Sequence, residues 1–93
     1  MAMQFLALSR RRAEKCGYIN FQLRLDAEAA LVRDLHQAGI IRQIWHRGDA
    51  PGKCLLIEAQ SEASARAILE VSPLIGTGLF EIDAIVPLKS YEV

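Results

Sequence analysis

Four side chains along this sequence could carry out acid–base chemistry: Arg42, His46, Glu58 and Asp83. A carboxylate can remove a proton from a carbon atom beside a carbonyl group, and a nearby cation can stabilise the negative oxygen that forms. Each of the four lies among apolar residues, where a charge without a partner is costly. We treat them as candidate catalytic residues, with Glu58 or Asp83 as the base and Arg42, alone or with His46, stabilising the oxyanion.

Alternation along the predicted strands assigns these candidates to faces. In a strand, successive side chains point to opposite sides of the sheet. The groups that share a face are then Ile40, Arg42, Ile44 and His46; Cys54, Leu56 and Glu58; and Glu81, Asp83 and Ile85. Because mostly apolar faces belong against helices, we expect these mixed faces to point into the interior of a barrel.

Trp45 lies on the other face of its strand, with Gln43 and Arg47. An aromatic side chain of this kind packs in a core or at an interface more often than it supports a substrate. Together with Ile44 and Leu56 it is nevertheless a candidate for the substrate pocket. If Trp45 faces inward, the assignment of faces reverses, and Gln43 with Arg47 becomes the polar set.

A structural role is an alternative for each charged candidate. Arg42 can form a cross-strand ion pair with Glu58 or with Asp83. His46 is near a strand end, where it can be a solvated residue at the rim of the sheet.

The strands and helices that position these residues follow from periodicity and turn residues. We predict strands over Met3–Ser9, Ile40–Arg47, Lys53–Ala59 and Leu79–Pro87. Residues 48–52 have the composition of a turn and join the two middle strands into a hairpin. Ser61 can cap a second helix that stops at the Ser72-Pro73 step.

A first helix is predicted to end at Gly39, because glycine is favoured just beyond a helix C-terminus. Its start is predicted between Ala13 and Asn20. Alternating apolar residues over Tyr18–Leu25 also allow a short strand there, with Asp26 as the cap of a shorter helix.

The order of these elements, βαββαβ, predicts an α+β, ferredoxin-like fold: one four-stranded antiparallel sheet with two helices on one face. No linker divides the chain, so we expect residues 1–93 to form a single domain. The other face of the sheet would be uncovered in a monomer. Pairing two such faces into a closed barrel buries them, so we expect a homodimer or a higher oligomer, a dimeric α+β barrel.

Composition limits the class of partner. Eleven basic and eleven acidic residues cancel, so no overall field attracts nucleic acid or an anionic membrane. We read the cluster Arg10-Arg11-Arg12 as a solvated turn. No apolar run approaches the ~20 residues of a membrane helix, and the amino terminus does not resemble a signal peptide. Two cysteines and two histidines without ligand spacing predict no metal site and a reducing, cytoplasmic location.

Several short motifs resemble those of one known family. The stretch from Gly39 to Trp45, followed by a hairpin and an acid at Glu58, resembles the central segment of muconolactone isomerases. Ser72-Pro73-Leu74, Glu81-Ile82-Asp83 and Val86-Pro87-Leu88 resemble later parts of the same family. The motifs cover residues 39–89, a little over half of the chain. The turn over residues 49–52 is longer than in that family, and the start of the first helix has no counterpart.

The resemblance implies a dimeric α+β barrel and an isomerase that moves a double bond in a small unsaturated lactone by proton transfer, without a metal or organic cofactor. The superfamily also contains monooxygenases and proteins without known chemistry, so fold alone does not choose the function. Two alternatives stay open. One is a non-catalytic protein that binds a small aromatic-derived ligand or serves in assembly, and the other is a cofactor-free monooxygenase.

Overall fold

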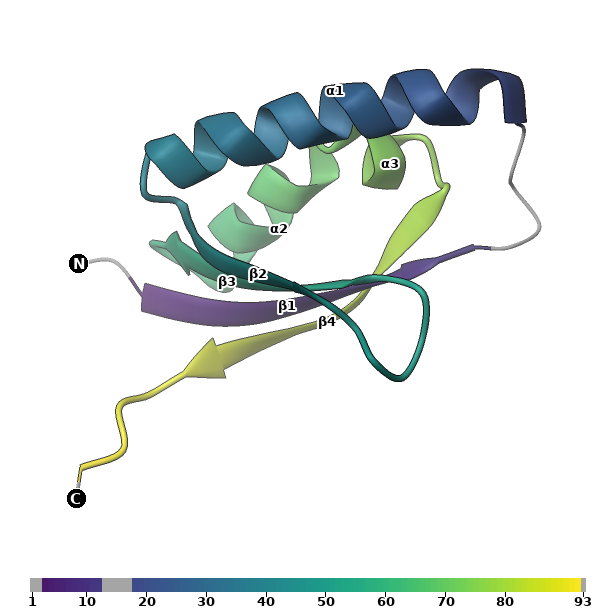
Figure 1. Cartoon of the computed structure of the whole chain (residues 1–93). Helices are drawn as coiled ribbons and strands as arrows, with labels where there is room; N and C mark the ends of the chain where they lie inside the picture. Colours follow the sequence, from purple (N-terminus) through teal and green to yellow (C-terminus); the bar gives the residue numbers. More distant parts are fainter. Residues whose placement is uncertain (1–2, 13–17, 93) are drawn as a thin grey trace.

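The computed structural model of the chain describes residues 3–12 and 18–92. Its elements, in chain order, are β1 (Met3–Arg11), α1 (Tyr18–Gln37), β2 (Ile41–His46), β3 (Lys53–Ala59), α2 (Glu62–Glu70), α3 (Pro73–Gly76) and β4 (Phe80–Leu88) (Figure 1). The predicted order of four strands and two main helices is confirmed. The short α3 was not predicted. It begins with the proline that we expected to stop the second helix, because proline suits the first turn of a helix.

The four strands form one sheet in the order β2-β3-β1-β4, with every neighbouring pair antiparallel. The helices all cover the same face of this sheet, with α1 lying across it beside α2 and α3 (Figure 1). This is the ferredoxin-like α+β fold. The fully buried residues Phe5 and Ile57 face each other across β1 and β3 on the helix-covered side. They form the centre of the hydrophobic core.

The ends of the elements match the local signals in most places. Gly39 has a φ of +77°, and the Ile40 N–H donates to the Leu35 carbonyl at 2.9 Å, which closes the C-terminus of α1. Ser61 caps α2 by accepting from the Ser64 N–H at 3.1 Å. The helix interpretation of residues 18–25 is confirmed over the short strand. Residues 13–17 of the predicted start lie outside the described residues.

Two β-bulges correct the predicted faces. In β2 the register against β3 shifts between Ile41 and Gln43, so Ile44 and His46 lie opposite Leu55 and Lys53. Leu55 is buried against the helices, so Ile44 and His46 belong to the helix-covered side. The prediction that both point away from the helices was therefore wrong. A bulge adds one unpaired residue and reverses the alternation beyond it.

The second bulge lies in β4. Leu8 pairs with Ala84 and Ser9 with Ile82, which leaves Asp83 as the extra residue. Ile85 is consequently buried on the helix side, opposite Ala7. The predicted grouping of Asp83 with Ile85 on a face away from the helices was wrong for this reason. The grouping of Cys54, Leu56 and Glu58 in β3, which has no bulge against β1, is confirmed.

Strand β1 also continues past its predicted end at Ser9. Arg10 pairs with Glu81 and Arg11 with Phe80 in β4, so backbone pairing extends the strand into the basic cluster. Arg10 is therefore part of the sheet and not of a turn.

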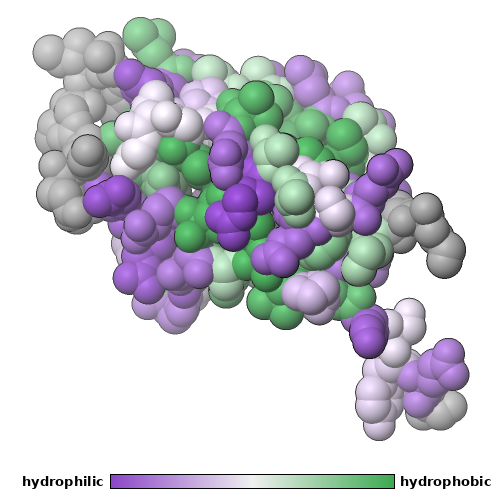
Figure 2. All heavy atoms as spheres, turned by 180° about the vertical axis from the view of Figure 1, so that it is seen from behind, coloured by the Kyte–Doolittle hydropathy of each residue, from purple (hydrophilic) through white to green (hydrophobic). Residues whose placement is uncertain are grey.

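The sheet face away from the helices is largely apolar and has no covering element among the described residues. Its apolar residues are Leu6, Leu8, Trp45, Cys54, Leu56, Ala84, Val86 and Leu88. We call this set the open face. Seen from behind, hydrophobic side chains come to the surface between polar ones, and the segment after β4 projects from the body (Figure 2). None of the described helices is both long and apolar enough to span a membrane.

Candidate functional site

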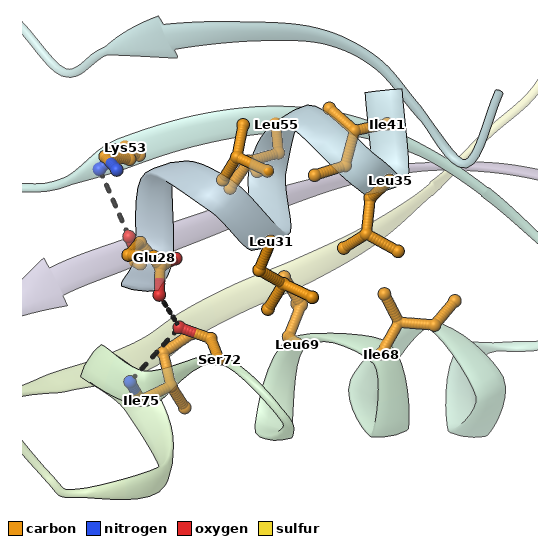
Figure 3. Close-up of a pocket in the computed structure, with 12 residues that line it drawn as sticks. Glu28, Leu31, Leu35, Ile41, Lys53, Leu55, Ile68, Leu69, Ser72 and Ile75 are labelled. Carbon is orange, nitrogen blue, oxygen red and sulfur yellow. Dashed lines mark hydrogen bonds between the residues drawn. The ribbon is translucent and has the colours of Figure 1, made fainter. Parts of the chain in front are cut away.

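The most unusual polar group beneath the helices is the carboxylate of Glu28, on α1. Glu28 is only 9% exposed. The Ser72 hydroxyl donates a hydrogen bond to its Oε2 (Figure 3). The Leu74 N–H donates to the same oxygen at 3.4 Å. A buried carboxylate needs such donors, because burying it without them costs roughly several kcal/mol of free energy. Glu28 is thus held in place from the segment between α2 and α3.

Ser72 also organises the chain that follows it. Its hydroxyl oxygen accepts from the Ile75 N–H at 3.4 Å, which makes it the N-cap of α3 (Figure 3). The same oxygen therefore accepts from the helix and donates to the carboxylate. The position of α3 and the orientation of Glu28 depend on one side chain.

A small cavity adjoins Glu28 between α1, the sheet and the two shorter helices. Its volume is about 30 Å³, enough for about one water molecule. Eight of its lining residues are apolar: Leu31, Val32, Leu35, Ile41, Leu55, Ile68, Leu69 and Ile75. The polar ones are Ser9, Glu28, Lys53 and Ser72. The Ser9 hydroxyl accepts from the Lys53 backbone N–H at 3.1 Å, so this part of the wall is also hydrogen-bonded.

A larger groove lies beside this cavity, between α1 and the edge strand β2. Its volume is about 340 Å³, at the small end of the range for ligand pockets. It is lined by Ala29, Val32, Arg33, Ile44, Trp45, His46 and Lys53. We call it the α1–β2 groove. Val32 and Lys53 line both the groove and the cavity, so the two hollows are neighbours.

The structure separates the sequence-predicted residues into four places: the α1–β2 groove, the open face, the Arg42–Glu58 pair and the surroundings of Asp83. His46 and Ile44 line the α1–β2 groove from the helix-covered side of the sheet. Trp45 borders the groove at the edge of β2, but its register opposite Cys54 puts its side chain on the open face. Leu56 lies on the open face, opposite Gln43 and Leu6. Because the sheet separates its two faces, Leu56 cannot line one pocket with Ile44 and His46 within a single chain.

Arg42 and Glu58 form an ion pair, with 3.9 Å between Nε and Oε1. Both side chains are partly exposed, and such pairs contribute at most about 1 kcal/mol. The pair lies near the start of β2, at the opposite end of that strand from His46. The structural alternative of a cross-strand ion pair is thus present in the structure.

Asp83 is joined to two other arginines. Its Oδ2 lies 2.9 Å from Nη1 of Arg47 and 3.4 Å from Nη2 of Arg10. Arg47 also holds Asp49, at 2.7 Å. Hydrogen bonds from Arg47 lower the pKa of Asp49 to about 2 and also lower the pKa of Asp83. These contacts, which we call the Arg47 clamp, hold the β2–β3 hairpin loop against β1 and β4.

Sequence reasoning missed Glu28 and Ser72. Glu28 was included in the apolar stripe of the first helix, and Ser72 was read only as a helix stop. The available signal was the position of Glu28 within the apolar stripe. Glu28 lies three residues before Leu31 and four before Val32, and side chains at that spacing share a helix face. Nothing local indicated that Ser72 would reach it.

No group of histidine, cysteine, aspartate and glutamate that could hold a metal is found within residues 3–12 and 18–92. Cys54 is a partly buried free thiol on the open face. The Glu28 carboxylate is held in place at the cavity, and the neighbouring groove offers the cationic side chains of Arg33 and Lys53 to a small ligand.

Comparison with known proteins gives a likeness of fold. The chain resembles the solved structure of 5-chloro-2-hydroxyhydroquinone dehydrochlorinase (TftG) from Burkholderia phenoliruptrix AC1100, in complex with 2,5-dihydroxybenzoquinone. The TM-score is 0.60 at 22% identity, over 98% of this chain and 96% of that one. At this identity the likeness shows the fold alone. No protein-family model matches the chain, and no curated protein matches it.

Proposed function

We propose that this protein is a cofactor-independent enzyme that transfers a proton on a small cyclic unsaturated carbonyl compound, with Glu28 as its base. The observation that carries the proposal is a nearly buried carboxylate, held by Ser72, at a cavity beside a groove large enough for one ring. A general base has to be held within reach of the proton that it removes, and the contact with Ser72 holds Glu28 in one position.

The chemistry needs only groups that the site contains. The substrate ring occupies the α1–β2 groove, and Glu28 takes a proton from a carbon beside the carbonyl, directly or through one water in the small cavity. The electrons of the broken C–H bond move to the carbonyl oxygen. Lys53 supplies positive charge for this enolate, and His46 can donate a ring N–H to it. Return of the proton to another carbon of the conjugated system shifts the double bond.

Two likenesses support this class of substrate. Residues 39–89 resemble muconolactone isomerases, whose substrate is an unsaturated lactone. TftG, which shares the fold, is a dehydrochlorinase solved with a dihydroxybenzoquinone. Both ligands are single oxygenated rings, and a ring of that size fits a groove of about 340 Å³. Isomerisation of a lactone is the reaction we propose, with loss of chloride from a hydroxylated ring as the related one.

The test compares two carboxylates. Purified protein is incubated with muconolactone and, separately, with 5-chloro-2-hydroxyhydroquinone, and absorbance and chloride release are followed. Glu28→Gln is expected to lower kcat by about 10²–10⁴-fold, the usual contribution of a general base. Glu58→Gln, which changes one of the two carboxylates that the sequence suggested as the base, is expected to retain activity. If Glu58→Gln loses activity and Glu28→Gln keeps it, the base is Glu58, with Arg42 as its partner.

Other outcomes separate the alternative functions. Turnover that requires oxygen would indicate a monooxygenase. Saturable ligand binding without turnover would indicate a non-catalytic binding protein. Either result would contradict the proposed proton transfer.

We also propose that the protein forms a homodimer through the open face. Trp45 and Val86 on this face are each 43% exposed, and a continuous apolar surface of this kind is typical of an interface. A second copy presents the same surface, so the contact is self-complementary. Pairing of the two sheets would produce the dimeric α+β barrel expected from the sequence.

A further inference from the structure

We infer that the small cavity beside Glu28 binds one water molecule between the Ser9 hydroxyl and Oε1 of Glu28, and that this water carries the proton between substrate and base. Ser9 is then a positioning residue, which acts through the water. The binding of the water is independent of any reaction, and its part in proton transfer rests on the proposed function.

The first partner of the water is Ser9, which is 5% exposed and lines the cavity from β1. Its Oγ accepts from the Lys53 backbone N–H at 3.1 Å, and its carbonyl oxygen accepts from Nη1 of Arg47 at 3.4 Å. A serine hydroxyl can also donate one hydrogen bond. Within residues 3–12 and 18–92, no group accepts a hydrogen bond from Ser9 Oγ. Because a buried donor without an acceptor costs free energy, this position favours a ligand that accepts.

The second partner is Oε1 of Glu28. The two hydrogen bonds that hold the carboxylate, from the Ser72 hydroxyl and the Leu74 N–H, both go to Oε2. In the described part of the chain, no side chain or backbone group donates to Oε1. The second oxygen of a carboxylate that is only 9% exposed also needs a donor. Oε1 therefore favours a ligand that donates.

A water molecule meets both requirements and fits the space. Ser9 and Glu28 line the same cavity, and no hydrogen bond joins them directly among the described residues. The volume of about 30 Å³ holds about one water, and a buried water typically makes about two to four hydrogen bonds. Water can accept from Ser9 and donate to Oε1 at the same time. A chloride ion could only accept, so it would leave Oε1 without a donor.

The bound water extends the reach of Glu28 toward the α1–β2 groove. Val32 and Lys53 line both hollows, so the cavity adjoins the proposed position of the substrate ring. The remaining lone pair of the water takes the proton from the carbon beside the carbonyl, while the water gives one of its own protons to Oε1. The electron pair of the C–H bond moves to the carbonyl oxygen. The reverse transfer delivers a proton to the other carbon and restores the Glu28 carboxylate.

A crystal structure of the wild-type protein that shows ordered waters tests the site directly. One water is expected within hydrogen-bonding distance of both Ser9 Oγ and Glu28 Oε1. A direct hydrogen bond between Ser9 and Glu28, or a cavity without this water, would overturn the inference.

Two variants separate the Ser9 hydroxyl from the space around it. Ser9→Ala removes the donor and enlarges the cavity, whereas Ile68→Val enlarges the same cavity and leaves both polar partners in place. Ser9→Ala is expected to lose the water and to lower kcat about tenfold with KM unchanged, the effect of one hydrogen bond. Ile68→Val should keep the water and the wild-type kcat. If the two variants behave alike, Ser9 does not position the water.

Ser9→Cys replaces Ser9→Ala if the alanine variant does not fold. A thiol donates a much weaker hydrogen bond than a hydroxyl, so kcat should fall here too, with KM again unchanged. A wild-type kcat in Ser9→Cys would reject the role of the Ser9 donor.

The same measurements separate this inference from the proposed function. A water bound to Ser9 and Glu28 in a protein without Glu28-dependent turnover would sustain the water site and reject both the enzyme and the relay. Glu28-dependent turnover in a protein whose cavity binds no such water would sustain the enzyme, with direct proton transfer, and reject the inference.

Discussion

The Ser72 hydroxyl donates a hydrogen bond to the Glu28 carboxylate across 44 positions of the sequence. Glu28 comes from the long helix α1, and Ser72 from the turn between α2 and α3. The hydrogen bond joins α1 to the segment between α2 and α3 on the helix-covered side of the sheet. The same contact orients the proposed base. The packing of the helices and the proposed reaction therefore both depend on this one buried hydrogen bond.

Ser72→Ala is expected to lower the free energy of unfolding by about 1–3 kcal/mol, because Glu28 loses a donor while it stays buried. Ser61→Ala is the matched control, since Ser61 also caps a helix but has no buried carboxylate to hold. It should cost about 1 kcal/mol. Urea unfolding measures both. Equal losses would show that Ser72 acts only as a cap.

Gly52→Ala is expected to destabilise the protein strongly, by about 1–3 kcal/mol or more. A Cβ on Gly52 would lie 1.9 Å from the backbone oxygen of Ser9, so the hairpin loop would have to move away from β1. Gly48, in the same loop, has open space around it. Gly48→Ala should be neutral or slightly stabilising. Thermal unfolding of the two variants compares them directly, and similar midpoints would contradict the close approach.

The Arg47 clamp predicts a loss of stability in acid. The pKa of Asp49 is lowered to about 2 and that of Asp83 is lowered as well, both by hydrogen bonds from Arg47. A lowered folded-state pKa gives stability that is complete above the ordinary value and is lost as pH falls toward the lowered one. The melting temperature should therefore fall between about pH 4 and pH 2.

Removing the Arg47 clamp should make the melting temperature depend less on pH. In Arg47→Gln the two aspartates titrate closer to their ordinary values, so the fall in melting temperature over the same window becomes smaller. Arg42→Gln removes an arginine paired with Glu58 and leaves the clamp intact. It should follow the wild-type pH profile. A wild-type profile in Arg47→Gln would disprove the role of the clamp.

Val86→Lys is expected to convert the proposed dimer into a monomer, because it places a charge beside Leu6 among the apolar residues of the open face. Val71→Lys makes the same change at a valine that is 70% exposed at the end of α2, away from this face. It should leave the dimer intact. Light scattering at micromolar concentration measures both, and a monomeric wild type would reject the dimer.

The sequence by itself determined the order and type of the main elements. A period of about 3.6 along α1, alternation along β3, Gly39 beyond a helix end and Ser61 before a helix are local signals. They act over a few residues and so can be read without a structure. The ferredoxin-like fold follows from their order. Ile44, Trp45 and His46 were candidates because they stand out on a short apolar strand, and their role in a site stays a prediction.

Only the tertiary structure decided which of these residues meet. The bulges at Arg42 and Asp83 add one residue each to a strand, and no periodic pattern reveals where a register will shift. Glu28 looks like an interruption of an apolar stripe until Ser72 is placed beside it. Hydrogen bonds between distant segments depend on how helices and sheet pack, and packing is a property of the whole chain.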